Sequence, residues 1–179
     1  MNALYIVAIG TVPEAALQWA EEAAAEWFPL PPRRMPPLAI PEGAYDARRR
    51  QYQSAEFMKM LAQHAPSDAV RVLGITNVDL AIPMLSFLFG QAQLNGPIAI
   101  VSLCRLRQEF YGLPADEELS RERTVKEVLH ELGHTFGLTH CSERTCTMSL
   151  STAIELVDAK GSRYCDRCGS HLVQSFALL

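Results

Sequence analysis

Two histidines stand four residues apart, at 130 and 134, in a segment whose apolar residues recur at helical spacing. On a helical wheel at about 100° per residue, the apolar side chains fall within one face about 100° wide. These side chains are Val125, Val128, Leu129, Leu132 and Phe136. The two histidines fall one turn apart on another side. The pattern predicts a helix over residues 116–136 that packs on a sheet by its apolar face and presents two imidazoles elsewhere.

Gly137 follows this predicted helix directly, and His140 comes three residues later. Helices often end in a residue at positive φ, which glycine adopts without steric cost. A sharp turn there lets His140 return as a third imidazole. Three neutral imidazoles with one open position suit a catalytic zinc ion. The spacing therefore predicts His130, His134 and His140 as ligands of catalytic zinc, with Zn²⁺ as the cofactor.

Glu131 lies between the first two histidines and completes the pattern HExxHxxGxxH. Its carboxylate is expected within reach of a zinc-bound water, which makes it the candidate general base. The short HExxH pattern also occurs by chance, and the alternative interpretation is two surface histidines that bind no metal. The extended pattern on a correctly phased amphipathic helix is far more specific. We therefore favour the catalytic zinc.

Four of the five cysteines lie within the last 39 residues, in two pairs. The pairs are Cys141 with Cys146, and Cys165 with Cys168. Paired thiols at such spacings are typical of a tetrahedral four-cysteine zinc site, which is structural because no position remains for water. Disulfides or a redox-active CxxC are the alternatives. Both are disfavoured, because no export signal is present and the CxxC does not follow a first strand. We thus expect two zinc ions per chain. Cys104 is interpreted as a core residue in an apolar strand.

The remaining sequence predicts an α/β layer with a mixed sheet. Strands are expected at 4–9, 69–76, 85–94 and 97–103, and helices at 13–27 and 54–64. Asn95-Gly96 predicts a type I′ hairpin turn between the last two strands. Residues 28–41 contain six prolines and are expected to form an ordered surface loop. The arginine run at 48–50 is interpreted as a solvated surface.

Composition excludes several classes of protein. The 179 residues are 49% apolar and carry a net charge of −4, which fits one globular domain. The CxxC pair alone would allow a nucleic-acid-binding zinc knuckle, but a mildly acidic chain with scattered basic residues does not fit a nucleic-acid binder. No apolar run approaches the ~20 residues of a membrane span. The first ten residues look like a strand rather than a signal peptide, so we expect a cytoplasmic protein, and we expect a monomer.

The segment HELGHTFGLTHC, followed by Cys146-x-Met148 and Cys165-x-x-Cys168, resembles the archaemetzincins, a metzincin-like family of zinc metallopeptidases. The resemblance implies the same ligands and base, and it makes Met148 the Met-turn residue beneath the catalytic zinc. The gap from Met148 to Cys165 is 16 residues, about one shorter than the family pattern. Some metzincins place a tyrosine two residues after that methionine, where this chain has Leu150.

The resemblance also implies a fold. A mixed twisted sheet is expected to pack on helices that include the active-site helix, above a small zinc-stabilised C-terminal part. The single domain 1–179 would divide into subdomains 1–137 and 138–179. An edge strand of the sheet would bind extended peptide by β-augmentation, and we expect it within residues 85–94.

Peptide-bond hydrolysis is the function that these features favour, with a peptide or protein as substrate. In this hypothesis Glu131 takes a proton from water and passes it to the leaving amine. Tyr164 and His171 lie near the motif, but no feature marks either as an oxyanion donor. The alternative is a catalytically silent, zinc-stabilised module that binds a peptide or a protein. An intact Glu131 argues against it, since binding alone needs no general base.

Overall fold

A five-stranded sheet divides the molecule, and a computed structural model describes it over residues 2–177. The strand order is β2-β1-β5-β9-β8. The bounds are β1 Ala3–Ile9, β2 Pro32–Arg34, β5 Ala69–Thr76, β8 Gly90–Ala92 and β9 Ile98–Ser102. The first four strands in this order run parallel, and β8 is antiparallel at the edge. The expected mixed sheet is confirmed.

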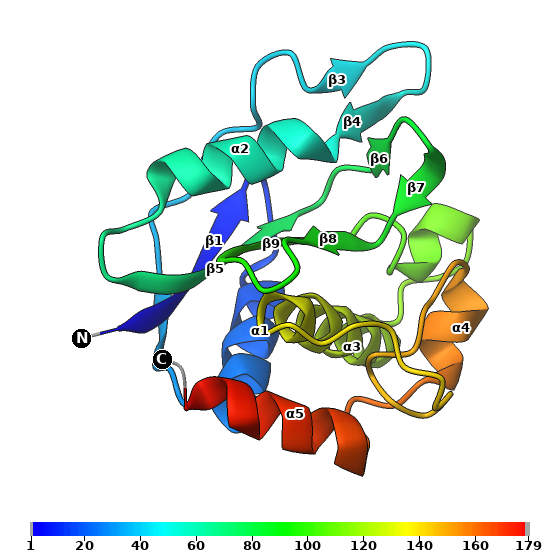
Figure 1. Ribbon diagram of the computed structural model, residues 1–179. Coiled ribbons are helices and arrows are strands. Elements are labelled where there is room, and N and C mark those ends of the chain that lie inside the picture. Colours follow the sequence, from blue (N-terminus) through cyan, green and yellow to red (C-terminus); the bar gives the residue numbers. More distant parts are fainter. Residues whose placement is uncertain (1, 178–179) are drawn as a thin grey trace.

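Helices cover both faces of the sheet, as Figure 1 shows. On one face lie α1 (Glu14–Trp27) and α3 (Glu117–Thr135), and on the other lies α2 (Ser54–His64). Each face has its own apolar core. The α1 and α3 core contains the fully buried Leu4, Leu73 and Leu132, and the α2 core contains Phe57 and Leu61. β1 and β5 read as continuous apolar runs because they are covered on both faces.

A second sheet of four short strands extends from the first, in the order β3-β4-β6-β7. The strands are β3 Tyr45–Asp46, β4 Gln51–Gln53, β6 Leu80–Ile82 and β7 Leu85–Leu88. The prediction of one strand over residues 85–94 is therefore wrong, because this segment forms two strands, β7 and β8 (Gly90–Ala92). Its first half pairs with β6, and its second half pairs with β9. An apolar run shows that a segment is partly buried, but it does not show which neighbour each half pairs with.

The turn after β8 also differs from the prediction. A type I′ turn needs a positive φ at both central residues. Asn95 has a φ of 54°, but Gly96 does not adopt a positive φ, so the prediction of a type I′ turn is wrong. Strand pairing ends earlier, where the Gln93 N–H donates to Ile98 O at 2.9 Å. Pro97 has no N–H to extend the ladder, which widens the loop to four residues.

The proline-rich segment forms more than a loop. β2 pairs with β1 at the outer edge of the sheet, where a missing N–H costs least. Cys104 lies after β9 rather than inside a strand, and it is half-buried. After β9 the chain forms a 3₁₀ turn (Gln108–Tyr111) before α3. Two helices not predicted from sequence close the chain, α4 (Ile154–Ala159) and α5 (Asp166–Phe176). No helix among residues 2–177 is long and apolar enough to cross a membrane.

Candidate active site

Helix α3 holds the first two histidines in the predicted orientation. The side chain of Asp116 caps the helix by accepting the Leu119 N–H at 2.9 Å. Val128, Leu129 and Leu132 are buried in the core, as the apolar stripe predicted. The helix is thereby fixed in rotation. His130 and His134 project from another side toward the loop that follows the helix.

That loop begins at Gly137, whose φ is 88°. The Gly137 N–H donates to His134 O at 2.9 Å, and the Leu138 N–H donates to Gly133 O at 3.1 Å. These bonds satisfy carbonyls at the end of α3 and turn the chain back. His140 then comes beside the other two imidazoles, with ring centroids 5.3 Å from His130 and 5.0 Å from His134. The structure thus brings the three predicted histidines together.

Two backbone carbonyls orient the helical imidazoles. His130 Nδ1 lies 2.8 Å from Thr147 O, and His134 Nδ1 lies 2.7 Å from Leu138 O. A carbonyl has no proton to give, so each Nδ1 carries the hydrogen and each Nε2 keeps its lone pair. The two Nε2 atoms lie only 3.1 Å apart. Two lone pairs repel at that distance unless a cation lies between them.

The donor set fits zinc. Tetrahedral ligands at a Zn–N distance of about 2.05 Å lie about 3.3 Å apart, close to the observed Nε2–Nε2 distance. One nitrogen from each of the three histidines lies within 4.8 Å of the others. Burial lowers the pKa of all three rings, and that of His130 most strongly. Each ring is therefore neutral at pH 7, the state that binds metal.

Glu131 is buried beside the trio. Burial raises the pKa of its carboxyl well above the usual value, and the charge of Glu127 adds to the shift. The side chain lies against the backbone of β8 at Gly90. If Gly90 carried a Cβ atom, that atom would lie only 2.6 Å from both Cγ and Oε1 of Glu131. Gly90 is thus a residue that sequence reasoning missed. Only a glycine leaves room for this carboxylate.

A cavity of about 500 Å³ opens over these groups. One wall contains the three histidines, Glu127 and Glu131. Another wall is residues 85–92, which we call the rim segment, and residues 150–152 also line the cavity. The lining is mainly apolar outside the titratable cluster. A mainly apolar cleft with a few convergent polar groups is typical of a substrate site.

The edge strand within the rim segment has backbone groups free to pair. The Ser102 N–H donates to Phe89 O at 2.8 Å, and the Gln93 N–H donates to Ile98 O at 2.9 Å. Because hydrogen-bonded and non-bonded pairs alternate in an antiparallel ladder, residues 89, 91 and 93 bond toward the β9 side. The N–H and C=O groups of Gly90 and Ala92 therefore point away from β9, on the outer edge of the sheet.

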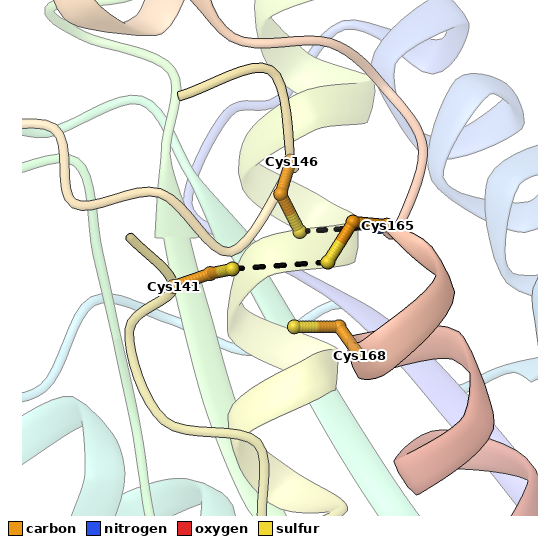
Figure 2. A group of neighbouring side chains, drawn as sticks. All are labelled: Cys141, Cys146, Cys165 and Cys168. Atoms are coloured by element: carbon orange, nitrogen blue, oxygen red, sulfur yellow. Dashed lines mark hydrogen bonds between the residues drawn. The ribbon is translucent and has the colours of Figure 1, made fainter. Parts of the chain in front are cut away.

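The four predicted cysteines also converge (Figure 2). Cys141 and Cys146 come from the loop after α3, whereas Cys165 and Cys168 come from the start of α5. Their sulfur atoms lie within 4.8 Å of one another, and Cys141 Sγ lies 3.8 Å from Cys165 Sγ. Tetrahedral thiolates at a Zn–S distance of about 2.3 Å lie about 3.8 Å apart. The sulfurs are too far apart for disulfides, and their spacing fits zinc.

Hydrogen-bond donors surround the sulfurs. The Glu143 N–H donates to Cys141 Sγ at 3.4 Å, the Arg167 guanidinium donates to the same atom at 3.3 Å, and the Cys165 N–H donates to Cys146 Sγ at 3.3 Å. Burial raises the pKa of Cys141, but the hydrogen bonds from Glu143, Arg167 and the neighbouring thiols outweigh it and lower the value to about 7. Burial instead raises the pKa of Cys146 and Cys168. Such donors stabilise thiolates, the form that binds zinc.

Three other residues named in the sequence analysis, Met148, Tyr164 and His171, lie near the candidate site. Met148 is fully buried under α3, where a Cβ on Gly133 would lie 2.6 Å from its sulfur. Tyr164 is also buried, and its hydroxyl donates to Leu129 O at 2.6 Å, so it serves the packing of α3. His171 lines a separate, smaller hollow beside His140 and Cys141.

Sequence reasoning missed a buried ion pair behind the trio. Lys160 Nζ lies 2.7 Å from Glu127 Oε1 and 3.4 Å from His130 Nδ1. Glu127 precedes Glu131 by one helical turn, so helical spacing already placed it on the same side of α3. Lys160 carried no such signal, since only the tertiary fold brings α4 to this point.

Comparison with known proteins identifies the group to which the chain is related. The sequence model of peptidase family M54 matches residues 23–174. The archaemetzincin of Methanocaldococcus jannaschii is 40% identical over 160 residues, covering 89% of this chain and 87% of that protein. The chain belongs to peptidase family M54, the archaemetzincins. The archaemetzincin of Thermococcus kodakarensis is 36% identical, with full coverage of both chains.

Solved structures agree with this placement. The crystal structure of the archaemetzincin from Methanopyrus kandleri matches with a TM-score of 0.86 at 36% identity, covering 98% of this chain and 96% of that one. A zinc-dependent peptidase from Methanocorpusculum labreanum matches with a TM-score of 0.82 at 29% identity, covering 95% and 100%. The resemblance to the archaemetzincins, the mixed α/β fold and the class of zinc metallopeptidase are confirmed.

The close approach of Gly90 to Glu131 generates a prediction for this archaemetzincin. In Gly90→Ala the new methyl group displaces the Glu131 side chain, and we expect peptide cleavage to fall by about 100-fold, the loss that a 1 Å misplacement of a catalytic group can cause. Zinc content, measured by elemental analysis, should stay unchanged. Gly169→Ala is the control, because nothing lies within 4 Å of its built Cβ. A Gly90→Ala variant with full activity would contradict the steric argument.

Proposed function

We propose that His130, His134 and His140 hold a catalytic zinc ion and that Glu131 is the general base for peptide-bond hydrolysis. The observation that carries this proposal is that the Nε2 atoms of His130 and His134 lie 3.1 Å apart, beside the buried carboxyl group of Glu131. When bound, zinc supplies a Lewis acid that lowers the pKa of a water molecule and polarises a peptide carbonyl. A site with three protein ligands keeps a position open for such chemistry.

Glu131 can act in both halves of the reaction. Its carboxylate takes a proton from the attacking water, and the carboxylic acid then passes that proton to the leaving amine nitrogen. Because burial raises the pKa of Glu131 well above its usual value, the carboxylate is a stronger base toward that water than an exposed glutamate. Gly90 keeps the carboxylate in the cavity, at the place where the peptide backbone would lie.

The substrate in this proposal is a peptide or protein segment in extended form. Its backbone would pair with the outward N–H and C=O groups of Gly90 and Ala92, adding a strand to the sheet. The rim segment and Leu150 line the cavity where its side chains would lie. The mainly apolar lining supports peptides with apolar side chains next to the cleaved bond.

The cysteine cluster is proposed to hold a second, structural zinc ion. All four positions around that ion are protein sulfurs, so it offers no place for substrate. The ion would stabilise residues 138–179 as a C-terminal subdomain against residues 1–137. Cys141 directly follows His140, so the same ion would also hold the third histidine in place.

Replacing the carboxylate tests the catalytic assignment. Glu131→Gln keeps the shape of the side chain but cannot accept a proton, so we expect kcat to fall by at least about 100-fold with zinc content unchanged. The measurement is cleavage of a peptide library, followed by mass spectrometry, with and without a chelator. Cleavage by the variant at the wild-type rate would refute the assignment. A wild-type protein that binds these peptides without cleaving them would support the silent binding module instead.

The metal content tests the two sites separately. We expect two zinc ions per chain in the wild type and one in a Cys165→Ser/Cys168→Ser double variant, because serine hydroxyls bind zinc poorly. A His130→Ala/His134→Ala variant should also hold one. Elemental analysis of the purified proteins gives the count, and circular dichroism shows whether each variant is folded. A wild-type value of one per chain would remove one of the sites.

The pKa shifts set the direction of the pH dependence. Burial lowers the pKa of each imidazole below its ordinary value, so protons compete with zinc only below about pH 6.5. Lower pH favours the protonated, metal-free form, and affinity should stay level from pH 8 to 6.5 and then fall. Competition with a chelator at several pH values, compared between the wild type and the His130→Ala/His134→Ala variant, isolates the histidine site while the cysteine site stays intact. An affinity that already falls between pH 8 and 7 would contradict the lowered pKa values.

A further inference from the structure

The rim segment has little support from strand pairing where β7 begins. β7 is the last strand of its sheet, so within residues 2–177 one edge of its backbone has no strand partner. Pro83 and Met84 join it to β6, and Met84 is 87% exposed. Leu85 is half exposed, yet it lines the cavity. The sheet holds this end of the rim segment from one side only, where Leu85 pairs with Ile82 of β6, so the other side needs a different support.

Arg49 supplies that support through three backbone carbonyls. Its Nη1 donates to Ile82 O at 2.8 Å, and its Nη2 donates to Leu85 O at 2.5 Å and to Ser86 O at 3.0 Å. The three oxygens lie on both sides of the turn between β6 and β7. A guanidinium presents its donors in a rigid planar fork, which a lysine does not. One side chain thus joins the two ends of this turn.

The segment that carries Arg49 is itself held in position. Asp46 Oδ1 accepts the N–H groups of Arg48 at 2.9 Å and Arg49 at 3.2 Å. Arg49 Nε donates to Gln51 Oε1 at 3.0 Å. Arg50 adopts a φ of 55°, which is unfavourable for a residue with a side chain. Backbone strain of this kind persists where the surrounding contacts require it.

A second set of contacts holds the middle of the rim segment. Gln51 Nε2 donates to Ser86 O at 2.8 Å and to Asp79 Oδ2 at 2.9 Å. Asp79 accepts two hydrogen bonds from Arg105, at 2.7 and 2.8 Å. The Arg105 guanidinium lies 4.3 Å from the centre of the Phe87 ring, and Phe87 lines the cavity. Arg49 and this chain of contacts meet at Gln51.

We propose that Arg49 is a positioning residue for peptide binding. It fixes the rim segment without touching the substrate, and so it sets how well the apolar lining and the outward groups of Gly90 and Ala92 receive a peptide. This inference rests on the proposed function. It also assigns a role to the arginine run at 48–50, because only Arg49 of the three turns inward against the cleft wall, whereas its neighbours are exposed.

The matched test compares Arg49→Gln and Arg49→Lys with Arg48→Gln. Arg48 is exposed, and within residues 2–177 its only hydrogen bond to a side chain is made by its backbone N–H, so Arg48→Gln removes the same charge one position away. Losing the guanidinium leaves carbonyls unpaired, so KM should rise about tenfold in Arg49→Gln. With chemistry untouched, kcat should stay within about twofold. Arg49→Lys keeps the charge and should not restore KM, and Arg48→Gln should behave as wild type.

Hydrogen–deuterium exchange gives a measurement that does not depend on catalysis. Amides of residues 82–92 should exchange at least about tenfold faster in Arg49→Gln and Arg49→Lys, while those of α3 and zinc content stay unchanged. Wild-type exchange in both Arg49 variants would overturn the proposal. A fall in kcat at constant KM, or the same change in Arg48→Gln, would also overturn it. A wild-type protein that cleaves no peptide refutes the proposed function before any Arg49 variant is made, so the two failures are distinguishable.

Discussion

The geometry of the active site depends on two hydrogen bonds from imidazole rings to backbone carbonyls. His130 bonds to Thr147 O and His134 to Leu138 O, and each bond fixes both the rotation of a ring and the nitrogen that carries its proton. Both carbonyls belong to the chain that returns after α3. The lone pairs converge only because Gly137 turns that chain back against its own helix.

The returning chain is therefore shared between the two candidate metal centres. The Cys141 N–H donates to Met148 O at 2.9 Å, and the Thr147 N–H donates to Arg163 O at 2.9 Å. The loop from Cys141 to Met148 thus carries two of the four sulfurs and also the Thr147 carbonyl that orients His130. An ion held by the sulfurs would therefore stabilise the backbone that orients His130. The hydrogen bond to the Thr147 carbonyl matters because contacts outside the ligand set fix the direction in which a ligating imidazole points.

The wall of the cleft that the rim segment forms is built in another way. It is a segment that passes from one sheet to the other at Phe89, with polar side chains in place of a continuous strand ladder. Gly90 lets this wall approach the Glu131 carboxylate, and Arg49 holds its outer end. One wall is thus a rigid helix in a packed core, and the other depends on a few hydrogen bonds to backbone oxygens.

The sequence alone determined the parts of the site that local rules govern. Helical periodicity placed His130 and His134 on one side of α3, glycine marked its end, and cysteine spacing indicated four thiols, since these features depend on neighbours in the chain. Tertiary structure alone decided that residues 85–92 divide between two sheets, that Lys160 lies behind His130, and that Arg49 lies against the cleft wall. The contacts of Lys160 and Arg49 join residues about 30 positions apart or more, and their partners are backbone oxygens or buried charges whose positions no local pattern encodes. The strands on either side of residues 85–92 are near in sequence, but the apolar pattern does not say which of them each half pairs with.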